Sequence, residues 1–166
     1  MEKRNKNKKI ILGIDPGSTK IGYGVISYTN KELKPKAIGY GYIDLRNYNV
    51  QAKRLLQLHK DIKNLLDQYK PDSIIIESIY FFKNSKTFIP VVQSRGIILL
   101  TAAQAKIDIY EYSPLQIKQT ITGYGRANKK FVQKLVQTSL DISSNIKPDD
   151  ASDALAVALC HLRNLT

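Results

Sequence analysis

Three short apolar segments near the start of the chain constrain its fold more than any other feature. They run from Ile10 to Ile14, from Ile21 to Tyr28 and from Ala37 to Asp44, and they are rich in β-branched and aromatic residues. Turn-forming residues, Asp15-Pro16-Gly17-Ser18, separate the first two segments. Because connections this short join neighbouring antiparallel strands, the chain is predicted to open as a meander.

The spacing of the apolar residues changes after this meander. From Gln51 to Tyr69 they recur at three- and four-residue steps, which predicts an amphipathic helix that Pro71 ends. The run from Asp72 to Glu77 is too apolar for a strand with one wet face, so it predicts a central parallel strand. The later signals predict a helix within Thr87 to Ala105 with Pro90 near its first turn, a strand from Ile107 to Tyr112, a helix that Ser113-Pro114 opens and Gly123 breaks, a helix from Lys129 to Leu140 and a last helix from Asp149 to Leu162.

The order of these elements predicts an α/β fold. Three antiparallel strands, followed by two parallel strands on helical crossovers, make a five-stranded mixed sheet with helices on both faces. The length of 166 residues suits one such domain, which we expect over residues 10–166, after a basic, flexible leader at residues 1–9.

Charge and cysteine content limit the partners of the chain. Lys and Arg number 26 against 14 Asp and Glu, and the formal charge of +12 favours a polyanionic partner, nucleic acid first and an anionic membrane surface second. No apolar run reaches the roughly 18 residues of a spanning helix, and the basic start has no apolar signal core, so we expect a cytoplasmic protein. The single cysteine, Cys160, excludes an internal disulfide, and with only two histidines it argues against a structural zinc site.

Carboxylates stand at three places in apolar surroundings. Asp15 and Glu77 each close an apolar strand, and Asp150 and Asp153 are three residues apart in the alanine-rich last helix, hence on one helical face. If the strand ends meet that helix, four carboxylates converge, and such a cluster needs protons or bound cations. Mg²⁺, held by carboxylates and substrate phosphate, is the usual solution, and two such ions serve phosphodiester hydrolysis.

Each carboxylate also has an ordinary structural explanation. Asp15 before Pro-Gly suits the start of a turn, Glu77 a strand end facing solvent, and Asp149 or Asp150 after Pro148 a helix N-cap. Asp153 is the hardest to explain in this way, because it lies beyond the cap position inside an alanine-rich face.

Several motifs also follow one another in a specific order and spacing. They are Ile14-Asp15-Pro16-Gly17-Ser18 with Gly22-Tyr23-Gly24, Ile76-Glu77-Ser78 leading to Phe82-Lys83-Asn84, Gln93-Ser94-Arg95-Gly96, Glu111-Tyr112-Ser113-Pro114, Lys118-Gln119, Thr122-Gly123-Tyr124-Gly125-Arg126-Ala127 and Asp150-Ala151-Ser152-Asp153-Ala154-Leu155-Ala156. Together they resemble the RuvC-type Holliday junction resolvases, which have the ribonuclease H-like fold. The likeness covers nearly everything after the leader.

The resemblance implies a homodimeric endonuclease that resolves four-way DNA junctions in recombination and repair by paired symmetric nicks. It implies Mg²⁺ as cofactor, two ions per site with Mn²⁺ as a substitute, a branch-migration complex of the RuvA and RuvB type as partner, and a place at the nucleoid. The implied catalytic and metal-binding carboxylates are Asp15, Glu77, Asp150 and Asp153, with Asp149 as an alternative four residues from Asp153. Lys118 and Lys129 resemble the lysines near the scissile phosphate, with Lys130 adjacent to the second.

The expected DNA surface combines aromatic and basic residues. The resemblance gives Tyr80 the place of the family's aromatic residue that stacks on bases, with Phe81 or Phe82 as an alternative. Burial in the core is the other interpretation for at least one of these three side chains. Candidate phosphate contacts are Lys83, Lys86, Arg95, Lys118, Arg126, Lys129, Lys130 and Lys134, about half of which would be ordinary solvated side chains, Lys134 first. Small residues at Gly22 and Gly24 would let a nucleic-acid backbone approach, unless they mark bulges.

Other assignments stay open from the sequence. The helix face near Ile97, Leu100 and Ala103 suits either a dimer surface or plain core packing. A ribonuclease H-like nuclease acting on RNA or hybrids is the main enzymatic alternative. A sugar kinase or actin type of ATPase needs two such domains where 166 residues hold one, and a non-catalytic binder of branched DNA would not need the intact carboxylates.

Overall fold

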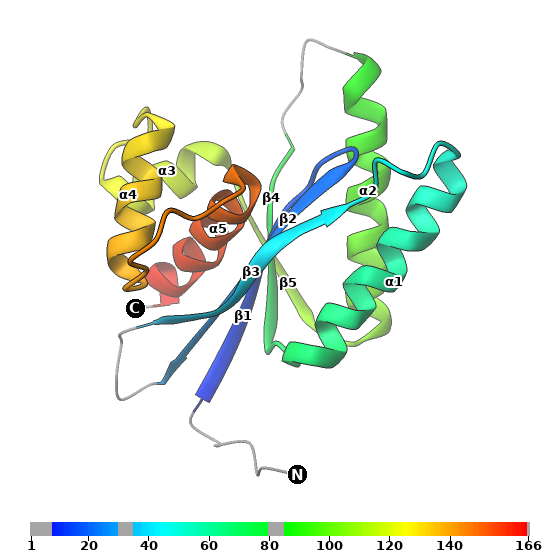
Figure 1. Cartoon of the computed structure of the whole chain (residues 1–166). Helices are drawn as coiled ribbons and strands as arrows, with labels where there is room; N and C mark the ends of the chain where they lie inside the picture. Colours follow the sequence, from blue (N-terminus) through cyan, green and yellow to red (C-terminus); the bar gives the residue numbers. More distant parts are fainter. Residues whose placement is uncertain (1–7, 30–34, 80–84, 166) are drawn as a thin grey trace.

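A five-stranded mixed sheet forms the centre of the molecule (Figure 1). The computed structural model describes residues 8–29, 35–79 and 85–165. The strands are β1 (Lys8–Asp15), β2 (Lys20–Thr29), β3 (Lys36–Asp44), β4 (Ser73–Glu77) and β5 (Asp108–Tyr112), in the spatial order β3-β2-β1-β4-β5. β2 is antiparallel to β1 and β3, whereas β4 is parallel to β1 and β5. The predicted sheet is therefore confirmed.

Helices cover both faces of the sheet, as predicted. They are α1 (Gln51–Tyr69), α2 (Ser85–Gln104), α3 (Pro114–Thr122), α4 (Lys129–Ser139) and α5 (Asp149–Leu165). Figure 1 shows α1 and α2 on one face and α3, α4 and α5 on the other. Because successive strand side chains point to opposite faces, Ile11 of β1 joins the core under α5, while Leu12 and Ile14 join the core under α1 and α2.

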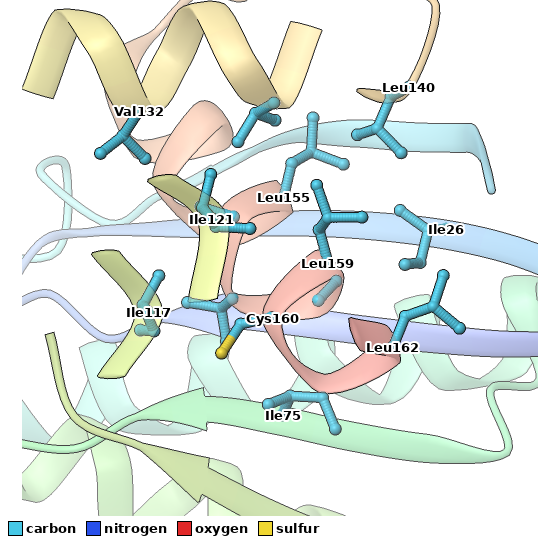
Figure 2. Close-up of a cluster of buried hydrophobic side chains, with 14 of the residues drawn as sticks. Ile26, Ile75, Ile117, Ile121, Val132, Leu140, Leu155, Leu159, Cys160 and Leu162 are labelled. Atoms are coloured by element: carbon cyan, nitrogen blue, oxygen red, sulfur yellow. The ribbon is translucent and has the colours of Figure 1, made fainter. Parts of the chain in front are cut away.

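α5 is the helix that packs most deeply. From Ala151 to Leu162 all of its residues except Asp153 are buried. In Figure 2, Leu155 and Leu159 lie in the core that α5 shares with the sheet residue Ile26. Each buried leucine contributes about 1.5–3 kcal/mol to folding, so this helix is held firmly against the strands.

Three glycines of the sheet make the close contact with α5 possible. A Cβ on Gly13 would collide with the backbone at Ala154, one on Gly22 with the backbone of Asp150, and one on Gly24 with the backbone of Leu155. The expectation that Gly22 and Gly24 leave room for a nucleic-acid backbone is wrong, because α5 fills that space. The glycines instead bring the acidic start of α5 down to the sheet.

The signals for helix ends are mostly confirmed. The Ser113 side chain accepts a hydrogen bond from the Gln116 N–H in a capping box, and Gly123 ends α3 with a left-handed φ of 78°. Pro90, however, does not lie in the first turn of its helix: α2 begins at Ser85, which places Pro90 inside the helix. There Pro90 has no N–H for the carbonyl four residues earlier.

The first described residues already belong to the sheet. Lys8 and Lys9, which we expected in the leader, are part of β1, and Lys9 Nζ lies 3.3 Å from an Asp72 carboxylate oxygen. Residues 1–7 of the expected leader lie outside the described residues, so its flexibility and the domain boundaries stay predictions. Within the described part of the chain, none of the helices combines the length and apolarity needed to cross a membrane.

Candidate active site

The ends of β1 and β4 lie side by side at one edge of the sheet. The parallel register pairs Ile14 with Ile76, so the residues that follow them, Asp15 and Glu77, are neighbours. The four residues before each carboxylate are buried, and each carboxylate is the first partly exposed residue after them. The sequence pattern of an apolar strand closed by an acid therefore reflects a real juxtaposition.

The first turns of α5 complete the acidic cluster. β2 pairs Gly22 with Asp15, and the backbone of Asp150 passes directly over Gly22. Asp153 follows one turn along α5 and is its only partly exposed residue between Ala151 and Leu162. The close packing of α5 on the glycines thus brings its acidic turn to the two strand ends.

The carboxylates influence one another strongly. Burial, followed by the charges of Glu77, Asp153 and Asp150, raises the pKa of Asp15 from 3.8 to about 8. Burial, followed by the charge of Asp153, also raises the pKa of Glu77 above its ordinary value. The pKa of Asp153 is likewise raised, first by burial, against the opposing effect of Lys129. Burial and mutual repulsion therefore disfavour the fully ionised form of this cluster.

Two lysines, Lys118 and Lys129, line a cleft of about 220 Å³ together with Glu77 and Asp153. Lys129 Nζ lies 2.8 Å from Asp153 Oδ2 and 3.4 Å from Asp149 Oδ2. Burial by itself would lower the pKa of Lys129, but the hydrogen bond and charge of Asp153 outweigh it, so the pKa is raised and the ammonium stays charged. The cleft is lined by Glu77, Pro114, Ile117, Lys118, Lys129, Val132, Asp153 and Ala156.

The structure separates the two adjacent aspartates of α5. Asp150 acts electrostatically on Asp15. Asp149 is exposed, pairs with Lys129 and accepts a hydrogen bond of 3.2 Å from Gln133 Nε2. Asp150 is therefore the aspartate that acts on Asp15, whereas Asp149 acts on Asp153 and helps to hold Lys129. Sequence reasoning missed this contact of Asp149, because spacing alone places both aspartates near Asp153.

The other predicted DNA-contacting residues whose side chains the structure describes do not line this cleft. Arg95 of α2 forms an ion pair with Glu111, with Nη2 2.5 Å from Oε1. Arg126 is exposed between α3 and α4, and Lys130 is exposed on α4, where it lines a second cavity together with Lys134. Tyr80, Phe81, Phe82 and Lys83, and the side chain of Lys86, lie outside the described residues.

The donor chemistry of the cluster fits a hard divalent cation. Asp15, Glu77, Asp150 and Asp153 offer only carboxylate oxygens, and their mutual repulsion favours a bound positive charge. Across the described ranges, no three acidic, histidine or cysteine side chains are already grouped as a metal site. The cation beside Asp153 in this arrangement is the Lys129 ammonium.

A five-stranded mixed sheet in this order, with helices on both faces, is the ribonuclease H-like fold. The family model described as "Crossover junction endodeoxyribonuclease RuvC" matches residues 11–161. The chain belongs to this RuvC family.

Curated relatives and solved structures agree with this assignment. The chain is 49% identical over 154 residues to the crossover junction endodeoxyribonuclease RuvC of Syntrophomonas wolfei, covering 93% of this chain and 88% of that one. It is 47% identical over 152 residues to that of Caldicellulosiruptor saccharolyticus, covering 92% and 91%. It is also similar to Thermus thermophilus RuvC in complex with a Holliday junction substrate, with a TM-score of 0.88, 27% identity and coverage of 95% and 94%.

Proposed function

We propose that this chain is an endonuclease that resolves four-way DNA junctions by paired symmetric nicks during recombination and repair. The observation that carries the proposal is the convergence of Asp15, Glu77, Asp150 and Asp153, with two lysines lining the same cleft as Glu77 and Asp153. Membership of the RuvC family supports the same substrate. Because that substrate is chromosomal DNA, we place the activity in the cytoplasm, at the nucleoid.

The carboxylate cluster is proposed to be the metal site. Asp15, Glu77, Asp150 and Asp153 would hold Mg²⁺, two ions per site, with Mn²⁺ as a substitute. When bound, the cation supplies an activated water and offsets charge on the phosphodiester. Asp15 and Glu77 are mounted on buried strands and α5 is packed on glycines, so the ligands are held in place before substrate arrives.

The two lysines are proposed to act on the scissile phosphate. Lys118 lies near enough to Glu77 to lower the pKa of that carboxyl, and Lys129 is paired with Asp153. A phosphate entering the cleft would offer both ammonium groups new oxygen partners, where charge develops during cleavage. Tyr80, or Phe81 or Phe82, is proposed to stack on bases beside the junction, and Lys83, Arg95 and Arg126 to contact its arms.

A homodimer is part of the proposal, because two symmetric nicks need two sites related by an axis. α2 carries exposed apolar side chains at Ile89 (60% exposed), Val92 (41%) and Leu100 (53%). Ala103 is also exposed, whereas Ile97 is half-buried against the core under α1 and α2. The exposed face of α2 that carries Ile89, Val92 and Leu100 is therefore the proposed dimer surface. A complex of the RuvA and RuvB type is the proposed further partner.

Cleavage of a synthetic four-way junction tests the function. With Mg²⁺ the protein should cut the junction symmetrically and leave a linear duplex of the same sequence, and an RNA–DNA hybrid, intact. Asp15→Asn and Asp153→Asn should bind the junction but cut it at least about 10³-fold more slowly. Asp67→Asn, an exposed position on α1, is the matched control. Equal cutting of linear duplex, or full activity of the two cluster variants, would refute the proposal.

A further inference from the structure

A second cavity, of about 350 Å³, lies next to the active cleft. It is lined by α4, by residues 145–147 and by the start of α5, and the residues that matter here are Lys130, Gln133, Lys134, Lys147, Asp149 and Ser152. Its volume is roughly ten times that of one water in the liquid. The cavity therefore has room for a phosphate group and part of the sugar attached to it.

The lining of this cavity is strongly basic. Lys130, Lys134 and Lys147 are all exposed, and none of them forms an ion pair with the described residues. The only acid in the lining, Asp149, is already paired with Lys129 and hydrogen-bonded by Gln133. Three unpaired ammonium groups around one cavity repel each other unless an anion lies between them.

A buried hydroxyl in the same lining lacks a partner. Ser152 is 1% exposed, and its Oγ makes no hydrogen bond within the described part of the chain. Such an uncompensated polar group costs free energy, and structures usually contain few of them. An anionic oxygen in the cavity is an acceptor for this hydroxyl, after a small movement of the long side chains around it.

The cavity and the active cleft share one wall. Ser152 lines the cavity and the next residue, Asp153, lines the cleft; the same holds for Lys130 and Lys129. The Lys129–Asp149 ion pair spans the two. Because successive phosphates of one strand are separated by only about 3.4 Å along a duplex axis, a neighbour of the phosphate in the cleft is close enough to enter this cavity.

We propose that the cavity is a second phosphate-binding site, which holds a backbone phosphate of the strand being cut, close to the scissile one. Lys130, Lys134 and Lys147 would neutralise it and Ser152 would donate a hydrogen bond to it. The proposal rests on the proposed function, because it assigns the substrate strand to this part of the surface. The role of this phosphate-binding site would be to fix the register of the strand in the cleft.

Junction binding without metal tests the charged part of this site. In Lys134→Gln/Lys147→Gln, the negative slope of log affinity against log salt should become shallower by about 1. The affinity near 0.15 M salt should fall roughly 5- to 10-fold. Lys53→Gln/Lys60→Gln is the matched control, with the same charge change on the exposed side of α1, across the sheet. If the two pairs behave alike, the proposal is overturned.

Ser152→Ala tests the hydroxyl, and its readout excludes a folding defect. Removing a buried hydroxyl without a partner should leave the melting temperature unchanged or raise it, while junction affinity falls about threefold. An affinity equal to that of the wild type would overturn the role of Ser152. In all arms, wild-type protein must bind and cut the junction, so failure of the proposed function is recognised separately.

Neutral substitutions in the DNA distinguish a strand phosphate from a general anion. Junctions with one methylphosphonate at each position around the cut are compared in wild type and in Lys134→Gln/Lys147→Gln. One position should weaken wild-type binding and have no further effect in the variant. If instead every methylphosphonate position has the same effect in both proteins, the assignment to the substrate strand is wrong. It is also wrong if inorganic phosphate binds to Lys134 and Lys147 but no position in the junction depends on them.

Discussion

The charge on Asp15 should destabilise the metal-free protein, and Asp15→Asn should remove this cost. The pKa of Asp15 is raised from 3.8 to about 8 by burial and by the neighbouring carboxylates. Between about pH 4 and pH 8, Asp15 therefore keeps its proton in the folded state but has lost it in the unfolded state. Stability then falls as the pH rises from about 4 to about 8.

The size of the effect follows from the shift. One pKa unit corresponds to about 1.36 kcal/mol, so the full shift evaluated at pH 7 sets an upper limit of about 4 kcal/mol. Asp15 is partly exposed, and solvent screening reduces the realised value, for which we expect about 2 kcal/mol. Asparagine has the same shape and does not ionise, so Asp15→Asn should gain this amount at pH 7 and almost nothing at pH 4.

Urea unfolding in EDTA at pH 4, 5, 6, 7 and 8 measures this prediction. The wild type should lose stability through this window relative to Asp15→Asn, while the exposed Asp67→Asn control stays parallel to the wild type. Millimolar Mg²⁺ should then stabilise the wild type more than Asp15→Asn, because binding to the folded state adds stability. Equal stability of wild type and Asp15→Asn at pH 7, without metal, would refute the repulsion on which the metal assignment depends.

Three further perturbations have defined outcomes. Gly13→Ala places a Cβ against the backbone of α5 at Ala154 and should cost about 3 kcal/mol in unfolding free energy, measured by urea denaturation; a loss below about 1 kcal/mol would contradict the packing described. Leu100→Asp on the exposed face of α2 should shift the protein to a monomer in sedimentation velocity while its circular dichroism spectrum stays that of the folded protein, and an unchanged dimer would exclude this surface. Lys129→Met should lower single-turnover junction cleavage about 10²-fold with little change in junction binding, whereas an undiminished rate would remove Lys129 from the site.

The local elements could be predicted because their signals are local. α1 runs from Gln51 to Tyr69, as its apolar periodicity predicts, since one face of the helix packs against the sheet. The cap at Ser113 and the stop at Gly123 depend only on nearby backbone groups and were also predicted correctly. Pro90 was misplaced because proline is common in a first turn but also tolerated further inside a helix, and its residue type does not distinguish the two.

The residues of the candidate site can be predicted from the sequence only in part. An acid that closes an apolar strand stands out in the sequence, so Asp15 and Glu77 could be recognised. Asp149 and Asp150 could not be separated, because residues three and four positions from Asp153 share its helical face. Their roles depend on what lies opposite: Asp150 lies over the strand that pairs with Asp15, and Asp149 meets Lys129.

By itself, the sequence determines the order of strands and helices, the acidic residues available and the excess of positive charge, because these follow from residue type and short-range spacing. Only the tertiary structure decides which element packs against each face that carries apolar or small residues. Gly22 and Gly24 are compatible with an approaching nucleic acid or an approaching helix, and only the packing of α5 shows that the helix takes that space. Periodicity encodes which face of an element is buried, but the partner of that face is a long-range contact, and that contact brings the carboxylates together.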